Sequence, residues 1–344
     1  MKKVLLVPSV KKGGGTGHIR RCIRLLLSLG DEARILAPKE GGADRWSAAE
    51  IIERFAPDLG EGRFAADSSG EWDFLVFDRR ETRRDEFFRI AGPRPALGLD
   101  EGGQARPLFT CLVDTFPRLL KGLEPNIAEE GFIAEGCPKP LSPPRAIRRV
   151  LLSFGGEDPS GLTELTLEAL LRQGLKAGDI GLVIGPAFSG PLPGHSGPVY
   201  PGLENIRPLF AAYDCVFTSF GITPYEALKE GRFPVLVNPS AYHEKLSRKA
   251  GFYSLGTGAV SRAKLKNLLA GPEACLKRTA EKFSPRTETA APPASPPQAL
   301  SYGEDLKAFV LNFSPPASAR CPACTERLRR PVFRNAEASF FLCP

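Results

Sequence analysis

Short apolar runs alternate with longer amphipathic stretches along most of the chain. In the first half, this pattern consists of apolar runs at 4–7, 33–36, 74–77 and 96–99 and intervening stretches at 19–29, 48–55 and 85–90. Such alternation predicts a parallel sheet with helices on both of its faces.

The second half repeats the pattern after a proline-rich stretch. The repeated segments are apolar runs at 150–154, 180–184, 215–218 and 234–237, helices at 162–171 and 241–250, and further segments at 205–212 and 224–230. Because Pro138, Pro140, Pro143 and Pro144 suit neither a helix nor a central strand, we place a domain boundary there. We therefore expect two α/β domains, over residues 1–145 and 146–283. Ligands of such open sheets bind outside the carboxyl ends of the strands.

Residues beyond this second domain have a different composition. Proline, alanine, threonine and serine dominate 284–300, which predicts a flexible linker because few large apolar groups are present. An amphipathic stretch within 301–315 predicts a helix that returns to the core, followed by a cysteine-containing tail at 316–344.

Composition and charge narrow the class of protein. The chain has 344 residues, of which 42% are hydrophobic and 25% charged, as in soluble globular proteins. No apolar run approaches the roughly 18 residues of a membrane span, and no signal peptide is recognisable, so we expect a cytoplasmic protein. The net charge of +7 suits an anionic ligand. Since the arginines are scattered and not interleaved with aromatic residues, we do not expect nucleic acid as a partner.

A glycine-rich turn follows the first apolar run and ends in a histidine. Residues 13–17 read Gly-Gly-Gly-Thr-Gly and precede His18 at the start of a predicted helix. Glycines such as Gly15 and Gly17 let backbone N–H groups approach an anion, and a helix N-terminus favours negative charge. A histidine at this point can transfer protons near neutral pH. The turn lacks the Gly-Lys-Ser/Thr ending of a Walker loop.

Three segments in order resemble successive motifs of one family. They are Gly-His-Ile-Arg-Arg-Cys at 17–22, Ser-Phe-Gly-Gly-Glu-Asp-Pro at 153–159, and Gly-Ile-Thr-Pro-Tyr-Glu-Ala-Leu at 221–228. The family is the UDP-sugar hydrolases of the pseudaminic acid pathway, relatives of the GT-B glycosyltransferase that adds N-acetylglucosamine to the lipid intermediate of peptidoglycan. The resemblance implies a GT-B-like α/β fold, with two Rossmann-like domains that face a cleft.

The resemblance also implies an activity and a set of site residues. It makes His18 the base for the water that cleaves the anomeric C–O bond of a UDP-sugar, without a cofactor. A turn at Gly155 and Gly156 suits the diphosphate, and the carboxylate of Glu226 suits the two ribose hydroxyls. The other substrate-binding residues that we assign are Gly15, Gly17, Arg21, Asp78, Thr223 and His243. For two of these a structural role is also open, because Asp78 suits a helix cap and His243 suits a helix surface.

Two departures from the family pattern bear on the substrate. Phe220 stands where the family has a small residue, and Lys11 and Lys12 replace an acidic residue ahead of the Gly-His motif. The identity of the sugar therefore does not carry over. Two alternatives to hydrolysis stay open: a GT-B glycosyltransferase that uses a sugar hydroxyl as acceptor, and a non-catalytic scaffold that binds a nucleotide sugar.

Three cysteines near the end of the sequence have the spacing of metal ligands. Cys321 and Cys324 form a Cys-x-x-Cys pair, and Cys343 supplies a third thiolate for a tetrahedral zinc ion. The tail resembles the zinc ribbon that precedes a methyltransferase domain in sugar-modifying enzymes, which implies such a domain or a sugar-modifying partner. The alternatives are a site completed by another subunit and a tail with free thiols.

Overall fold

The structure of the chain is a computed structural model. It describes residues 3–119, 123–128, 130, 134, 139–188, 190, 194–203 and 205–283. The linker, the returning helix and the three cysteines predicted beyond residue 283 lie outside the described residues.

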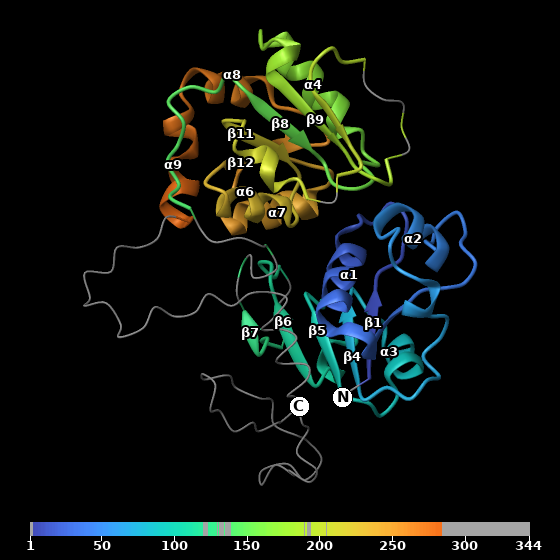
Figure 1. Ribbon diagram of the computed structural model, residues 1–344. Helices are drawn as coiled ribbons and strands as arrows, with labels where there is room; N and C mark the ends of the chain where they lie inside the picture. Colours follow the sequence, from blue (N-terminus) through green and yellow to red (C-terminus); the bar gives the residue numbers. More distant parts are fainter. Residues whose placement is uncertain are drawn as a thin grey trace. The chain divides into compact units, whose positions relative to one another are not determined.

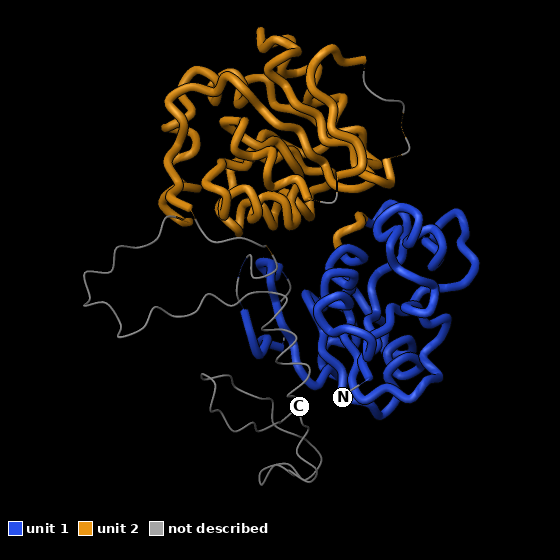
Figure 2. Tube along the Cα trace, viewed as in Figure 1, with its two compact units in different colours: residues 1–14, 18–132, 301–344 blue, residues 15–17, 133–300 orange. Residues whose placement is uncertain are grey.

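The described residues form two compact units (Figure 2). The first contains residues 3–14 and 18–130, and the second contains residues 15–17 and 134–283. Residues of the proline-rich stretch belong to the second unit, where the backbone N–H of Lys139 donates to the carbonyl of Lys229 at 2.9 Å. The division between the units therefore falls ahead of the whole proline-rich stretch and of the expected boundary at residues 145 and 146.

The first unit is built on a seven-stranded parallel sheet with the order β3-β2-β1-β4-β5-β6-β7 (Figure 1). Its strands are β1 (Val4–Pro8), β2 (Ala33–Leu36), β3 (Phe64–Ala65), β4 (Phe74–Asp78), β5 (Ala96–Leu99), β6 (Cys111–Asp114) and β7 (Ile127–Ala128). Its helices are α1 (Gly17–Leu29), α2 (Ala48–Phe55) and α3 (Arg84–Ala91), with short 3-10 turns at Gly30–Glu32, Glu61–Arg63 and Arg106–Leu108.

Burial explains why the central strands are continuous apolar runs. Every residue of β1 and β4 is buried, as expected where helices cover both faces of a parallel sheet. On one face, Val7 and Phe77 pack with Ile90 of α3. The opposite face carries α1, whose side chains contact Asp78 at the end of β4.

The second unit repeats this arrangement. Its six parallel strands have the order β10-β9-β8-β11-β12-β13. They are β8 (Val150–Ser153), β9 (Ile180–Ile184), β10 (Val199–Pro201), β11 (Cys215–Thr218), β12 (Phe233–Asn238) and β13 (Tyr253–Thr257). The helices are α4 (Leu162–Arg172), α5 (Arg207–Phe210), α6 (Thr223–Lys229), α7 (Ala241–Ala250), α8 (Arg262–Ala270) and α9 (Pro272–Phe283), with a 3-10 turn at Ala177–Asp179.

The sequence pattern predicts the fold class correctly, and the structure confirms two α/β units with parallel sheets. Segments 33–36, 48–55, 96–99, 180–184, 215–218 and 241–250 coincide with observed elements. The pattern did not indicate β6 or β13, which lie toward the sheet edges. Among the helices of the described residues, none combines the length and the apolar character needed to cross a bilayer.

Candidate functional site

Each sheet reverses its strand order at one point, and the predicted site residues gather at these points. In the first unit the chain steps from β1 outward to β3 and then returns to place β4 on the other side of β1. The loops after β1 and β4 therefore leave the carboxyl edge as neighbours. This is where open α/β sheets bind ligands. His18 follows the first of these loops, and Asp78 ends β4.

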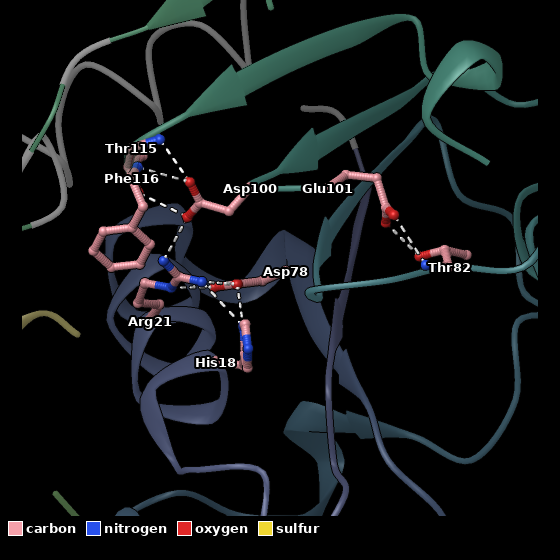
Figure 3. Close-up of polar contacts among 8 residues, drawn as sticks. All are labelled: His18, Arg21, Asp78, Thr82, Asp100, Glu101, Thr115 and Phe116. Atoms are coloured by element: carbon pink, nitrogen blue, oxygen red, sulfur yellow. Dashed lines mark hydrogen bonds and ion pairs between the residues drawn. The ribbon is translucent and has the colours of Figure 1, made fainter. Parts of the chain in front are cut away.

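His18 and Asp78 form a hydrogen-bonded pair at this edge (Figure 3). The distance from His18 Nδ1 to Asp78 Oδ1 is 2.7 Å, and the Asp78 side chain is fully buried. Because a carboxylate can only accept, this hydrogen bond requires a proton on Nδ1, so the neutral imidazole carries its lone pair on Nε2. The His18 side chain is 17% exposed. The pair thus has the chemistry of a general base held by a carboxylate.

Arg21 lies one turn further along α1 and binds the same carboxylate. Its Nε donates to Asp78 Oδ2 at 2.7 Å, and its Nη2 donates to Asp78 Oδ1. Nη2 also lies 3.0 Å from His18 Nδ1, but the shorter contact to the oppositely charged Asp78 determines the histidine proton. Only 2% of the Arg21 side chain is exposed. The sequence predicts that Arg21 binds substrate, whereas in the structure its guanidinium binds the carboxylates of Asp78 and Asp100.

Asp100 anchors Arg21 from the opposite side. Arg21 Nη1 donates to Asp100 Oδ2 at 3.0 Å, and the Asp100 carboxylate also accepts from the backbone N–H groups of Thr115 and Phe116 at 2.6 and 3.0 Å. The backbone of Asp100 has a φ of +52°, a conformation that non-glycine residues rarely adopt. Burial raises the pKa of the Asp100 carboxyl, and Arg21 opposes this shift.

The next residue, Glu101, fastens the loop after β4. Its carboxylate accepts from the N–H of Thr82 at 2.9 Å and from the Thr82 hydroxyl at 2.5 Å (Figure 3). It also accepts from the N–H of Gly103 at 2.6 Å. Glu101 is 1% exposed, and its burial raises the pKa of the carboxyl. The loops that follow β4 and β5 are therefore held together at the edge that carries Asp78.

The second unit reverses its strand order between β8 and β11. Gly155 and Gly156 lie in the loop after β8, and Gly155 has a φ of +84°, which glycine adopts without strain. The N-terminus of α4 that follows is already capped. The Asp158 carboxylate accepts from the N–H groups of Leu162 and Thr163 at 2.9 and 2.8 Å. An anion at this turn would therefore meet the glycine backbone rather than those two helix N–H groups.

The remaining predicted residues follow the neighbouring strands of the same unit. Thr223 begins α6 after β11, and Glu226 on that helix is 6% exposed. His243 lies on α7 after β12, and its Nδ1 is 2.8 Å from the Ser240 hydroxyl, which caps this helix. Because β8, β11 and β12 are adjacent parallel strands, the structure brings these loops to one edge of the sheet.

The structure thus groups the predicted residues into two sets. His18, Arg21 and Asp78 meet in the first unit, while Gly155, Gly156, Thr223, Glu226 and His243 share a sheet edge in the second. Gly15 has a φ of +86°, and Gly17 begins α1. Sequence reasoning missed Asp100, Thr115 and Glu101. The one available signal was an Asp-Glu pair directly after an apolar run. Within the described residues no group of histidine, cysteine, aspartate or glutamate has the arrangement of a metal site.

Replacing Arg21 with methionine is expected to destabilise the protein strongly. The change leaves the carboxylates of Asp78 and Asp100 buried without their cation, which typically costs about 3–5 kcal/mol. Urea unfolding would measure the loss. Arg83→Met is the matched control, because the Arg83–Asp85 pair is 74% and 66% exposed and is screened by solvent, so its loss should change stability little. Equal losses in the two variants would contradict the role given to Arg21.

Glu101→Gln is expected to weaken the pH dependence of stability. The unfolded chain loses the Glu101 proton near its ordinary value of 4.5, whereas burial keeps the proton on the folded protein to higher pH. The folded state then binds more protons than the unfolded state, so the free energy of unfolding falls as pH rises above about 4.5. Glutamine has nearly the same shape as glutamate but cannot ionise. The free energy of unfolding of the variant should therefore fall less steeply with pH than that of the parent. Part of the fall should remain, because the raised pKa of Asp100 acts in the same direction. Urea unfolding at several pH values would measure this; a slope equal to that of the parent and of Glu81→Gln would contradict it.

Comparison of the sequence with known proteins finds one partial relative. No protein-family model matches the chain. Over 112 residues it is 34% identical to an uncharacterized protein of Methanocaldococcus jannaschii, and this match covers 30% of the chain and 22% of that protein. The chain therefore spans less than a quarter of this curated relative.

Solved glycosyltransferases share the architecture. MurG of Acinetobacter baumannii superposes with a TM-score of 0.53 at 12% identity, over 91% of this chain and 100% of that protein. The spinosyn rhamnosyltransferase SpnG, solved in complex with thymidine diphosphate, gives 0.50 at 12% identity, over 82% of this chain and 94% of that one. The two parallel sheets and this likeness show that the chain has the GT-B glycosyltransferase fold.

Proposed function

We propose that the protein transfers a glycosyl group from a nucleoside diphosphate sugar to an acceptor hydroxyl. The observation that carries this proposal is the His18–Asp78 pair at the strand-order reversal of the first unit. The likeness to GT-B glycosyltransferases favours the transferase alternative of the sequence analysis over the UDP-sugar hydrolase. Fold alone does not establish chemistry, which depends on the residues of the site.

His18 has the geometry of a general base. Its contacts with the described residues are made through Nδ1, so Nε2 remains for an acceptor hydroxyl. Asp78 fixes the histidine proton on Nδ1 and stabilises the imidazolium that forms when Nε2 takes a second proton. Arg21 acts through Asp78 and is a positioning residue. Such base catalysis typically accelerates a reaction by about 10²–10⁴-fold.

The proposed reaction balances without any cofactor. The acceptor hydroxyl gives its proton to His18 Nε2 while its oxygen forms a bond to the anomeric carbon of the donor sugar. The bond between that carbon and the diphosphate oxygen breaks, and its electron pair leaves on the nucleoside diphosphate. A diphosphate already carries negative charge, so the remaining task of the protein is to bind it and to orient the reactants.

We assign the donor to the carboxyl edge of the second unit's sheet. The Gly155-Gly156 turn offers backbone N–H groups to a diphosphate, and Glu226 offers a carboxylate to the ribose hydroxyls. SpnG, which has a similar fold, was solved with a nucleoside diphosphate, which supports this class of donor. Uridine as the base rests on the resemblance of the motif at 221–228.

His18→Ala should lower turnover by about 10²–10⁴-fold and leave donor binding nearly unchanged, because the base is lost while the donor residues stay. Product formation from a panel of UDP- and dTDP-sugars with simple sugar acceptors would measure this. His195→Ala is the matched control, since the His195 Nε2 lies 2.8 Å from the Ile180 carbonyl. An unchanged rate in His18→Ala would overturn the assignment.

The same assay without acceptor separates the alternatives. A transferase should release little free sugar from the donor alone. Fast release of free sugar would instead support the hydrolase, and donor binding without any product would support the scaffold.

UDP should raise the melting temperature of the protein, and Glu226→Ala should remove most of that shift. A ligand that binds only the folded state stabilises it by mass action, and the variant lacks the carboxylate for the ribose. A thermal-shift titration would test this, with Glu164→Ala as the control because Glu164 is exposed on α4. An equal UDP shift in both variants would exclude Glu226 from the nucleotide site.

A further inference from the structure

One face of the first unit's sheet is only partly covered by the described residues. Along β2, Ala33 and Ile35 are fully buried, but Arg34 and Leu36, which point to the other face, are half-buried. A parallel sheet is usually covered by helices on both faces. Here the connection from β3 to β4, residues 66–73, has no helix. The face on the α3 side is therefore open beside β1 and β2.

A hollow of about 470 Å³ occupies this face. Its apolar lining includes Val7 of β1, Leu36 of β2 and Ile90 of α3. Protein sites for small molecules usually have about 300–1,000 Å³ and combine an apolar lining with a few polar groups. The size and the lining of the hollow match this description.

Hydrogen bonds that are part-buried, and one that is exposed, hold the walls in place. Arg94 donates to the carbonyls of Ser68 and Gly70 at 2.9 and 3.1 Å, and to those of Ile90 and Ala91 at 2.8 and 2.9 Å. This one side chain therefore ties the loop after β3 to the end of α3. Arg79 donates to Glu86 at 2.6 Å on another wall. The hollow is thus defined by fixed contacts rather than by exposed loops alone.

The charge at the hollow is positive. Arg45, Arg79, Arg89 and Arg94 line it, against the two acids Asp67 and Glu86. Asp67 is turned to its own loop, where it accepts from Ser69, and Glu86 is paired with Arg79. Among the described residues, the Arg45 guanidinium has one weak, exposed ion-pair partner, Asp44 at 3.7 Å. The Arg89 guanidinium forms no hydrogen bond or ion pair with any residue in the described part of the chain.

We propose that this hollow is a binding site for a small organic anion. The apolar part of the ligand would lie on the accessible apolar lining at Leu36 and Ala66, and its carboxylate or phosphate would meet Arg45 and Arg89. The lining reaches Arg79, the residue after Asp78, but includes neither His18 nor Asp78, so the hollow is a different site from that pair. This inference goes beyond the proposed glycosyl transfer and does not depend on it.

Anilinonaphthalene sulfonate is a suitable probe, because it joins aromatic rings to one anionic group. Titration of the full chain should show saturable fluorescence with one site per chain. Ala66→Trp should abolish the signal, because Ala66 is exposed and lines the hollow, so a large ring there fills it. Glu71→Trp, an exposed position of the same loop outside the lining, should bind as the parent does.

Charge reversal tests the anionic contact. Arg89→Glu should weaken probe binding by at least about fivefold, since an attraction is replaced by a repulsion. Arg84→Glu is the control, because Arg84 is exposed on the same helix and does not line the hollow. Circular dichroism would establish that all variants are folded.

Competition identifies the ligand class. Hexanoate and hexyl phosphate should displace the probe, and the more effective of the two tells whether a carboxylate or a phosphate is preferred. Hexanol lacks the anionic group and inorganic phosphate lacks the apolar chain, so each should displace the probe at least about tenfold less well. The absence of saturable binding, equal binding to the Ala66→Trp and Glu71→Trp variants, or equal displacement by hexanol would overturn the proposal.

Discussion

The reversal of strand order in each sheet is the constraint on which the sites depend. Where the order reverses, the two connecting segments go to opposite faces of the sheet, so the loops that leave the carboxyl edge do not cover one another. In the first unit these loops follow β1 and β4, and in the second they follow β8 and β11. The histidine and the glycine turns therefore sit where the backbone itself leaves room for a ligand.

Buried charge gives the first of these edges its rigidity. Removing the Arg21 guanidinium from water is costly, and the cost is offset only because Asp78 and Asp100 both accept from it. The left-handed backbone of Asp100 costs a further 1–2 kcal/mol or so. Its carboxylate gains the hydrogen bonds from Thr115 and Phe116 in exchange. Since Asp78 also holds His18, the same ion pairs that stabilise the edge fix the orientation of the candidate base.

The two faces of the same strands serve different purposes. On the α1 side, the ends of β1 and β4 are closed by charged hydrogen bonds around Asp78. On the α3 side, the described residues leave the sheet partly open, because a loop and not a helix connects β3 to β4. Alternation of side chains along a strand makes this division sharp, since neighbouring residues such as Phe77 and Asp78 belong to opposite faces.

The sequence by itself determined the elements and the class of fold. Runs such as 96–99 and 215–218 are mostly apolar and bounded by turn residues, so local pattern was enough to place them. Edge strands such as β13 were missed, because their identity comes from pairing with a neighbour rather than from a run of apolar residues. The sequence also indicated His18 and Asp78 as separate candidates.

Only the tertiary structure decided which of these residues form hydrogen bonds and ion pairs with one another. Asp78 suited either a ligand or a helix cap until the folded chain placed it between His18 and Arg21. Asp100 is 79 residues from Arg21 and carried no local signal for that pairing. Hydrophobic periodicity spans only a few residues, so it can be recognised in the sequence. An ion pair between distant residues depends on which strands become neighbours. Strand order is fixed by the packing of the whole sheet.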